Sequence, residues 1–154
     1  MRIEALQAHD RTGFATGIAE LDRYFRAQAG RDAAKGLAAV FVAVLEDERI
    51  GGFYCLAPAT VLLPNLMDGT RGGTRYPALQ AAFLPRLGVH RHQRGRGLGR
   101  ALLEDAKRRV RATSLEAVAL IARAAGPEAQ GFYLHAGFSA FADQPERVFS
   151  PLAA

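Results

Sequence analysis

The spacing of apolar residues along the chain predicts amphipathic helices separated by strands. Apolar side chains recur at helical spacing over residues 16–28, 98–112 and 127–135, and Thr16 stands where it can cap the first helix. Runs of β-branched and aromatic residues predict strands at residues 2–7, 37–45, 50–56, 82–89, 118–122, 138–141 and 147–149, with a short strand at 60–63. Elements in this order indicate an α/β fold whose sheet has mixed strand directions.

Proline and glycine residues mark where these elements bend or end. Pro85 removes a backbone donor from the strand at 82–89, so we expect a bulge or a local splaying of the sheet there. Residues 58–77 are rich in turn-forming residues and are predicted to form a long loop. Gly137 is placed to end the last helix as its C′ residue.

The composition is that of a globular protein, with 49% hydrophobic and 23% charged residues. The chain shows no repeat and no linker, so we expect a single domain over residues 1–154. Its first residues lack the apolar core of a signal peptide, and no apolar run is long enough to cross a bilayer. Cys55 is the sole cysteine and has no partner for an internal disulfide, which favours a cytoplasmic protein.

The net charge of +5 is concentrated in one part of the chain. Residues 71–111 hold 11 Lys and Arg and two acids, giving +9, whereas the remainder carries −4. A segment with this much positive charge is typical of a surface that binds a polyanion. The helix at 98–112 is predicted to bury Leu102, Leu103, Ala106 and Val110 and to expose Glu104, Lys107, Arg108 and Arg111.

The stretch from Arg94 to Arg100 alternates glycine with arginine at the point where a helix follows a strand. Glycine lets the backbone approach a ligand closely, successive N–H groups form an anion nest, and the helix N-terminus adds a favourable dipole. The stretch therefore predicts a phosphate site. A Walker A loop needs Gly-Lys-Ser/Thr, which is absent here, and a dinucleotide fingerprint needs a third glycine where Arg100 stands.

The pattern Arg94-x-x-Gly97-x-Gly99 resembles the acetyl-CoA pyrophosphate loop of the GNAT superfamily of N-acetyltransferases. The later run Phe132-Tyr133-x-x-x-Gly137-Phe138 is similar to a second motif of that family. The resemblance implies the GNAT fold, a single mixed, mostly antiparallel sheet that is splayed at the central strand and has helices on both faces. It also implies that acetyl-CoA is bound by Leu87, Val89, Arg94, Gly95, Gly97, Leu98, Gly99 and Arg100.

Tyr133 is the candidate general acid. A phenol with a pKa of about 10 is protonated at neutral pH and can supply a proton to a departing thiolate. The resemblance implies the same role, because the tyrosine of this motif commonly has it. The strands at 82–89 and 118–122 contain no Asp or Glu that could act as a base. We therefore expect the acceptor to be an amine of low pKa, such as an α-amino group.

The N-terminal part is similar to the GNAT toxins of type II toxin–antitoxin systems. The likeness lies in Phe14-x-x-Gly17-x-x-x-Leu21-Asp22-Arg23-Tyr24-Phe25-Arg26, in Arg31-Asp32 and in Arg75-Tyr76-Pro77. It implies acetylation of the α-amino group of charged tRNA, which blocks translation, a ribbon-helix-helix antitoxin as partner, and a homodimer. Candidate residues for the substrate or its RNA are Arg71, Arg75, Tyr76, Arg86, Arg91 and Arg96.

Other interpretations of the sequence remain. The acceptor could instead be a small-molecule amine or a protein N-terminus, and the domain could be a non-catalytic module that binds CoA or nucleic acid. His90-x-His92 lacks a third ligand nearby, so no metal is expected. Cys55 is expected to be a buried strand residue rather than a nucleophile, because no base stands near it in the sequence.

Overall fold

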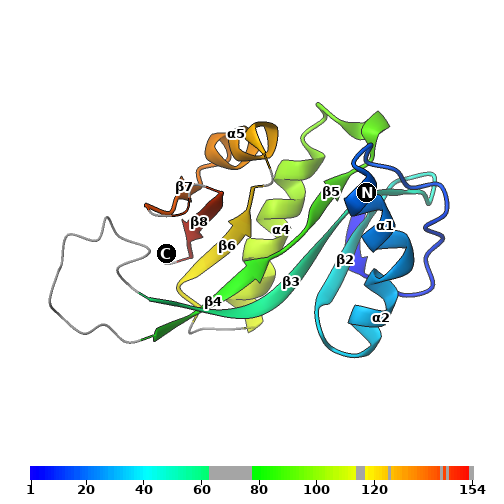
Figure 1. The fold of residues 1–154 in the computed structure, drawn as a ribbon. Coiled ribbons are helices and arrows are strands. Elements are labelled where there is room, and N and C mark those ends of the chain that lie inside the picture. Colours follow the sequence, from blue (N-terminus) through cyan, green and yellow to red (C-terminus); the bar gives the residue numbers. More distant parts are fainter. Residues whose placement is uncertain (63–77, 114–116, 125, 143, 145, 153–154) are drawn as a thin grey trace, which may run out of the picture. The chain divides into compact units, whose positions relative to one another are not determined.

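A computed structural model describes residues 1–62, 78–113, 117–124, 126–142, 144 and 146–152 (Figure 1). The strands are β1 (Arg2–Ala5), β2 (Ala39–Val44), β3 (Ile50–Leu62), β4 (Ala78–Leu84), β5 (Leu87–Val89), β6 (Ala119–Arg123), β7 (Ser139–Ala140) and β8 (Arg147–Pro151). The helices are α1 (Ala19–Ala27), α2 (Ala29–Ala34), α4 (Leu98–Thr113) and α5 (Pro127–His135), with a 3₁₀ turn, η1, at Arg91–Gln93.

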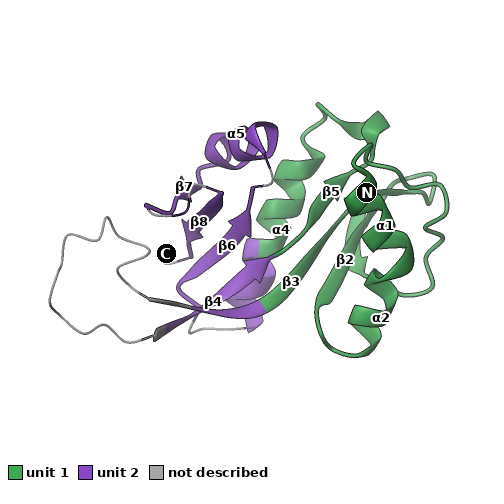
Figure 2. Cartoon of the chain, in the orientation of Figure 1, with its two compact units in different colours: residues 1–57, 85–106 green, residues 58–84, 107–154 purple. Residues whose placement is uncertain are grey.

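The strands pair in the order β1-β2-β3-β4-β6-β8-β7, and β5 pairs with β3. The β1–β2, β2–β3, β3–β5, β6–β8 and β7–β8 pairings are antiparallel, whereas β4 and β6 run parallel. The predicted α/β fold with a mixed, mostly antiparallel sheet is confirmed. The chain forms two compact units, 1–57 with 85–106 and 58–84 with 107–154 (Figure 2). A single domain over the whole chain stays a prediction.

The first unit buries one face of its sheet under α1 and α2. Phe53 on β3 lies on this face and stacks on Phe25 of α1, with ring centroids 4.3 Å apart. Phe14 packs edge-on against Phe53 from the segment before α1. The same face holds Cys55, fully buried, and Val42 of β2, whose register partner is Phe53. The side-chain alternation of β3 therefore sends Phe53 and Cys55 to the α1 and α2 side.

The other face of this part of β3 carries α4. A Cβ at Gly52 would stand 2.9 Å from a methyl carbon of Leu102, so glycine lets the helix lie directly on the strand. Tyr54 lies two residues beyond Gly52 and therefore on the same face of β3. Its hydroxyl donates to the Asp105 carboxylate at 2.5 Å, and both residues are buried. The expected placement of helices on both faces is confirmed here.

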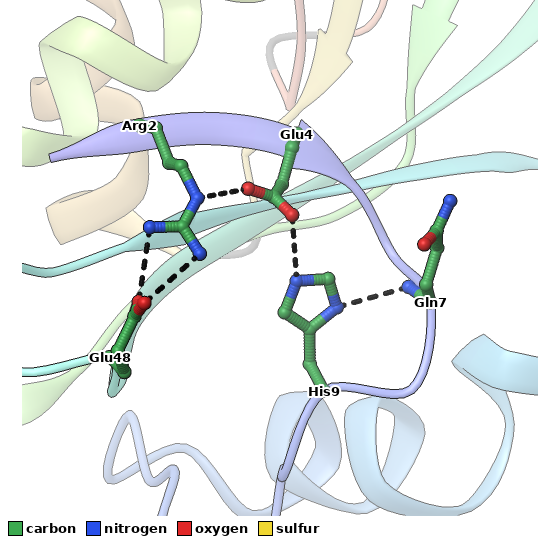
Figure 3. A network of polar contacts seen from close by, with 5 residues as sticks. All are labelled: Arg2, Glu4, Gln7, His9 and Glu48. Atoms are coloured by element: carbon green, nitrogen blue, oxygen red, sulfur yellow. Dashed lines mark hydrogen bonds and ion pairs between the residues drawn. The ribbon is translucent and has the colours of Figure 1, made fainter.

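A polar network joins the first strand to its surroundings (Figure 3). Glu4 of β1 accepts from Arg2 and faces the Nε2 atom of His9 at 3.2 Å. Arg2 also reaches Glu48, in the turn between β2 and β3, at 3.0 Å. The Nδ1 atom of His9 accepts from the backbone N–H of Gln7. These contacts hold the edge strand and the segment that follows it to the β2–β3 hairpin.

The second unit is built around β6, which is buried on both faces. Ile121 pairs with Phe83 of β4 on one side and with Phe149 of β8 on the other. Phe141 packs edge-on against Phe149 at 5.3 Å and closes this cluster. Helix α5 begins at Pro127 and is followed by Gly137 with φ +94°, so the predicted start and C′ glycine are confirmed.

The strand predicted at 82–89 is interrupted where Pro85 was expected to interrupt it. Strand β4 lies between β3 and β6, and its residues 82–84 pair with β6. From Leu87 onward the chain still pairs with β3 but, among the described residues, no longer with β6. Between them the Arg86 carbonyl accepts from the Cys55 N–H at 3.0 Å. The expected local splaying of the sheet is confirmed, because the chain leaves β6 here while it continues along β3.

Several predicted boundaries were wrong. Thr16 does not cap α1, which has Ile18 at its N-cap without a side-chain cap. A second helix, α2, forms where glycine and charged residues suggested an interruption, because Ala29 is buried against the α1 core. Residues 58–62 continue β3 as one long strand, so the predicted loop is wrong there and residues 60–62 of the predicted short strand belong to β3. Residues 63–77 lie outside the described residues.

The prediction for the polar face of α4 was also wrong at one position. Lys107 is buried, with its ammonium 5.2 Å from the centroid of the Phe138 ring. The predicted apolar positions Leu102, Leu103, Ala106 and Val110 are all buried, as expected. In the ranges that the structure describes, no helix combines the length and apolar character needed to span a bilayer.

Gly88→Ala should destabilise the fold. A Cβ at Gly88 would stand 2.8 Å from the Phe53 ring and 2.9 Å from the Thr16 methyl group, and neither neighbour can move to the surface because both are buried. We expect the free energy of unfolding to fall by about 1–3 kcal/mol in denaturant titration. Gly13→Ala is the matched control, because a Cβ at Gly13 meets nothing within 4 Å. Equal stability of the two variants would contradict this account of β5 packing.

Candidate functional site

The strand β5 is bonded to β3 through alternate residues only. Cys55 N–H donates to the Arg86 carbonyl, and the His90 N–H donates to the Gly51 carbonyl at 2.8 Å. With Phe53 opposite Gly88 in the register, these positions are the hydrogen-bonded pairs of an antiparallel ladder. The N–H and C=O groups of the two remaining residues, Leu87 and Val89, therefore point away from β3, toward the strand's other edge. These are the two strand residues that the sequence predicted to bind acetyl-CoA through their backbone.

The chain leaves β5 through η1 and then forms the predicted nest. Gly95 has φ +76° and Gly97 has φ +80°, whereas Arg94 before them has φ −65°. Arg96 has a negative φ, since Glu48 is the only non-glycine residue with positive φ in the described chain. Alternating signs of φ turn successive N–H groups toward one side, which is the arrangement of an anion nest.

Helix α4 begins inside this nest. The first N–H of the helix with an intrahelical partner is that of Ala101, which donates to the Gly97 carbonyl at 3.0 Å. The N–H groups of Leu98, Gly99 and Arg100 precede it and have no intrahelical acceptor. They add free donors and the positive end of the helix dipole to the nest. The Leu98 side chain is buried against Gly51, so Leu98 can offer a ligand its backbone only.

The nest has room for a diphosphate. A Cβ at Gly95 or at Gly97 would meet no atom within 4 Å, so packing against the protein does not explain why glycine stands at either position. The positive φ angles and the open space above them fit a backbone that a bulky anion approaches. The donor set of backbone N–H groups fits the pyrophosphate of acetyl-CoA in charge and in hydrogen-bonding character.

The arginines around the nest are placed differently from one another. Arg96 and Arg100 are exposed, and no ion pair or hydrogen bond within the described residues engages either guanidinium. Arg91 is exposed as well. The Arg94 guanidinium instead donates to the backbone carbonyl of Thr16. Arg96 and Arg100 thus remain available for an anion. Arg94 is exposed as well, but one nitrogen of its guanidinium is tied to Thr16.

In the second unit, Tyr133 has a buried ring and an unbonded hydroxyl. The ring packs between Phe132 and Phe138, with centroids 5.2 and 5.3 Å away. Every fully buried side-chain polar atom among the described residues has a hydrogen-bond partner, whereas the Tyr133 hydroxyl has none there. The hydroxyl therefore reaches solvent. Burial of the residue raises the pKa of Tyr133, so the phenol stays protonated at neutral pH.

The candidate RNA residues fall into three groups. Arg71, Arg75 and Tyr76 lie outside the described residues. Arg91 and Arg96 are exposed beside the nest. Arg86 is half-buried and lies over the Tyr24 ring, with its guanidinium carbon 3.8 Å from the ring centroid. The Arg86 guanidinium is therefore a packing partner of α1 in this structure.

Cys55 and the histidines have structural partners. Cys55 is fully buried, and burial raises the pKa of its thiol to about 11, which agrees with the predicted absence of a nucleophilic role. The Nδ1 atom of His90 accepts from the His92 N–H, and its Nε2 atom lies 3.3 Å from the Gly13 carbonyl. Both ring nitrogens of His90 are thus used by the backbone. Sequence reasoning missed the contacts of residues 13–17 with this region, because only the fold brings them to residues 90–94.

Comparison with known proteins places these features in a family. Residues 4–138 match the family described as Acetyltransferase (GNAT) family. A protein of Mycobacterium tuberculosis named tRNA-acetylating toxin is 36% identical over 133 residues, which cover 85% of this chain and 79% of the relative.

Two solved structures have the same fold. AtaT complexed with acetyl-methionyl-tRNAfMet superposes with a TM-score of 0.85 at 19% identity, covering 97% of this chain and 94% of that one. A mutant AtaT toxin bound to the C-terminus of the antitoxin AtaR and acetyl-CoA gives a TM-score of 0.83 at 20% identity, covering 98% and 92%. At these identities the structures establish the fold.

Gly97→Ala should weaken binding of coenzyme A. Alanine at φ +80° costs about 1–2 kcal/mol in backbone strain, and its methyl group would occupy the open space of the nest. We expect the affinity for coenzyme A, measured by calorimetry, to fall about tenfold or more. Gly36→Ala is the matched control, since Gly36 has φ +70° and equally open surroundings but lies outside the nest. The free energy of unfolding should fall by a similar amount in both variants. An unchanged affinity of Gly97→Ala for coenzyme A would contradict the assignment of the nest.

Proposed function

The chain belongs to the acetyltransferase (GNAT) family, and from that premise we propose that it transfers an acetyl group from acetyl-CoA to the α-amino group of aminoacyl-tRNA. The family confirms the predicted enzyme class, an N-acetyltransferase, and the predicted acetyl donor. The name of its relative from Mycobacterium tuberculosis, tRNA-acetylating toxin, supports the acceptor. The outward-facing backbone groups of β5, directly before the nest, are the observation that carries the donor site.

We assign the donor site to two adjoining features of the first unit. Among the described residues, the backbone groups of Leu87 and Val89 that point away from β3 have no strand partner, which suits the amide groups of a pantetheine arm. Gly95 and Gly97, with the first N–H groups of α4, suit the pyrophosphate. The exposed Arg96 and Arg100 stand beside these donors and can add positive charge.

Acetyl-CoA supplies an acetyl thioester. In the proposed reaction the acceptor amine forms a C–N bond to the acetyl carbon while the C–S bond breaks. The Tyr133 hydroxyl donates its proton to the departing sulfur, which suits a protonated phenol that has no competing hydrogen bond within the described residues. The amine releases a proton to water.

The carboxylates of the described residues support an acceptor that needs no dedicated base. Two are buried, and both are already engaged: Asp22 accepts from Thr16, and Asp105 accepts from Tyr54. The strands β4, β5 and β6 contain no acidic residue. A lysine side chain, with a pKa of about 10.4, would need a strong base, whereas an α-amino group titrates near about 7.7–8.0. A charged tRNA presents an amine of this second kind.

The remaining proposals concern partners and location. The exposed arginines near the nest support binding of tRNA phosphates. By similarity to the AtaT complexes, we propose an antitoxin as protein partner, of the ribbon-helix-helix type that the sequence indicates, and a cytoplasmic location. A homodimer stays a prediction.

The decisive assay incubates the protein with labelled acetyl-CoA and total charged tRNA. We expect label on the aminoacyl group, and we expect Tyr133→Phe to lower kcat by about 10²–10⁴-fold because it removes the general acid. Phe132→Leu changes the aromatic residue that packs on the Tyr133 ring but keeps the phenol itself, and it serves as the control for packing. The affinity for acetyl-CoA should be retained in Tyr133→Phe.

Two outcomes would redirect the proposal. If small amines or protein N-termini are labelled and charged tRNA is not, the proposed acceptor is wrong, but the assignment of acetyltransferase activity still holds. If Tyr133→Phe acetylates at the wild-type rate, the tyrosine is a packing residue and the proton comes from another source.

A further inference from the structure

The segment from Gly13 to Gly17 is held against the chain that leads into the nest. Four consecutive backbone carbonyls in this segment are engaged. Gly13 lies 3.3 Å from His90 Nε2, Ala15 accepts from the Arg91 N–H at 2.9 Å, and Thr16 accepts from the Arg94 guanidinium. The fourth carbonyl, of Phe14, accepts from Arg26 of α1 at 2.8 Å. Three of the four contacts therefore come from residues 90–94, directly before the nest glycines.

Asp22 fixes the end of this segment. Its carboxylate accepts from the Thr16 N–H and the Thr16 hydroxyl, both at 2.8 Å, and from the Gly17 N–H at 3.4 Å. Burial alone would raise the pKa of Asp22, but these hydrogen bonds outweigh it, and the net pKa is lowered. Asp22 is therefore a carboxylate at neutral pH. It holds Thr16 so that the Thr16 carbonyl faces Arg94.

We propose that Arg94 is a positioning residue, which anchors the nest to Thr16 and through it to Asp22, and that the pyrophosphate is bound by the nest backbone without the Arg94 side chain. The inference rests on the proposed acetyl-CoA site. It departs from the expectation that the Arg94 side chain contacts the pyrophosphate. Arg94 remains the first residue of the nest through its backbone. Its side chain anchors the nest, and its backbone forms part of it.

The geometry gives this anchor a clear consequence. Gly17 has φ +92°, and a Cβ there would stand 3.7 Å from the Arg94 guanidinium, so the chain passes under Arg94 as it turns into α1. Without the guanidinium, the Thr16 carbonyl would lose its donor and the loop before Gly95 would lose a tie to the core. The nest N–H groups would then be less well ordered before a ligand binds, and binding would have to order them.

A double-mutant cycle on coenzyme A binding tests the anchor. Arg94→Met should weaken the affinity, measured by calorimetry, by about tenfold, the usual size for a lost hydrogen bond to a charged group. Asp22→Ala, which touches no ligand in this account, should weaken the affinity in the same direction. The double variant should bind no more than about twofold more weakly than Arg94→Met alone, because both changes break one connection. At saturating acetyl-CoA, kcat should stay within about twofold of wild type in Asp22→Ala, which changes a positioning residue outside the nest.

Asp32→Ala is the matched control. Asp32 accepts from the Tyr24 hydroxyl at 2.8 Å elsewhere in the same unit, so its removal costs a comparable hydrogen bond without touching residues 13–17. It should leave the affinity for coenzyme A unchanged. If Asp22→Ala does not fold, Asp22→Asn provides the milder change at the same position.

Two results would overturn the anchor. One is wild-type affinity in the Asp22 variant together with a loss in Arg94→Met, which would mean that Arg94 contacts the pyrophosphate directly. The other is a double variant whose loss equals the product of the two single losses. Failure of the wild-type protein to bind coenzyme A would instead refute the proposed function.

Discussion

A three-residue strand with hydrogen bonds on one side only is the feature on which the candidate site depends. The ladder between β3 and β5 uses Gly88 and leaves the backbone groups of Leu87 and Val89 facing the other edge. Pro85 stands where the chain leaves β6 and continues along β3 alone among the described strands. Because Gly88 has no side chain, Phe53 and Thr16 can close over β5 and hold it in place. The free edge is thus built into a well-packed part of the first unit.

The chemistry assigned to the protein needs little beyond this edge, the nest and one phenol. Backbone donors suit an acetyl donor whose arm and diphosphate present acceptors along their length. Tyr133 is held by its aromatic neighbours, and its hydroxyl has no hydrogen bond among the described residues, which suits a group that must give up a proton. The two buried carboxylates among the described residues, Asp22 and Asp105, are engaged in holding the first unit together. An acceptor amine whose pKa lies near physiological pH, and which water can therefore deprotonate, fits this arrangement.

Local signals in the sequence predicted much of the fold and of the candidate site. The features that the sequence did not predict depend on long-range packing. The glycines of the nest, the break at Pro85 and the end of α5 each follow from the backbone freedom of single residues. The burial of Lys107 could not be predicted, because it depends on Phe138, which is distant in the sequence. Helix α2 was missed because burial of Ala29 outweighs the weak local pattern. Thr16 was taken for a cap, but its hydroxyl donates to the Asp22 carboxylate and accepts from the Ile18 N–H, so it holds the turn before α1.

Amide hydrogen exchange on the protein with and without acetyl-CoA tests the central claim most directly. The amides of Leu87 and Val89 should exchange rapidly in the free protein and slow by about tenfold or more when acetyl-CoA binds. The Gly88 amide, already directed at β3, should be protected in both states and serves as the internal control. Binding of acetyl-CoA without any change at Leu87 and Val89 would contradict the assignment of the free edge of β5 as the donor site.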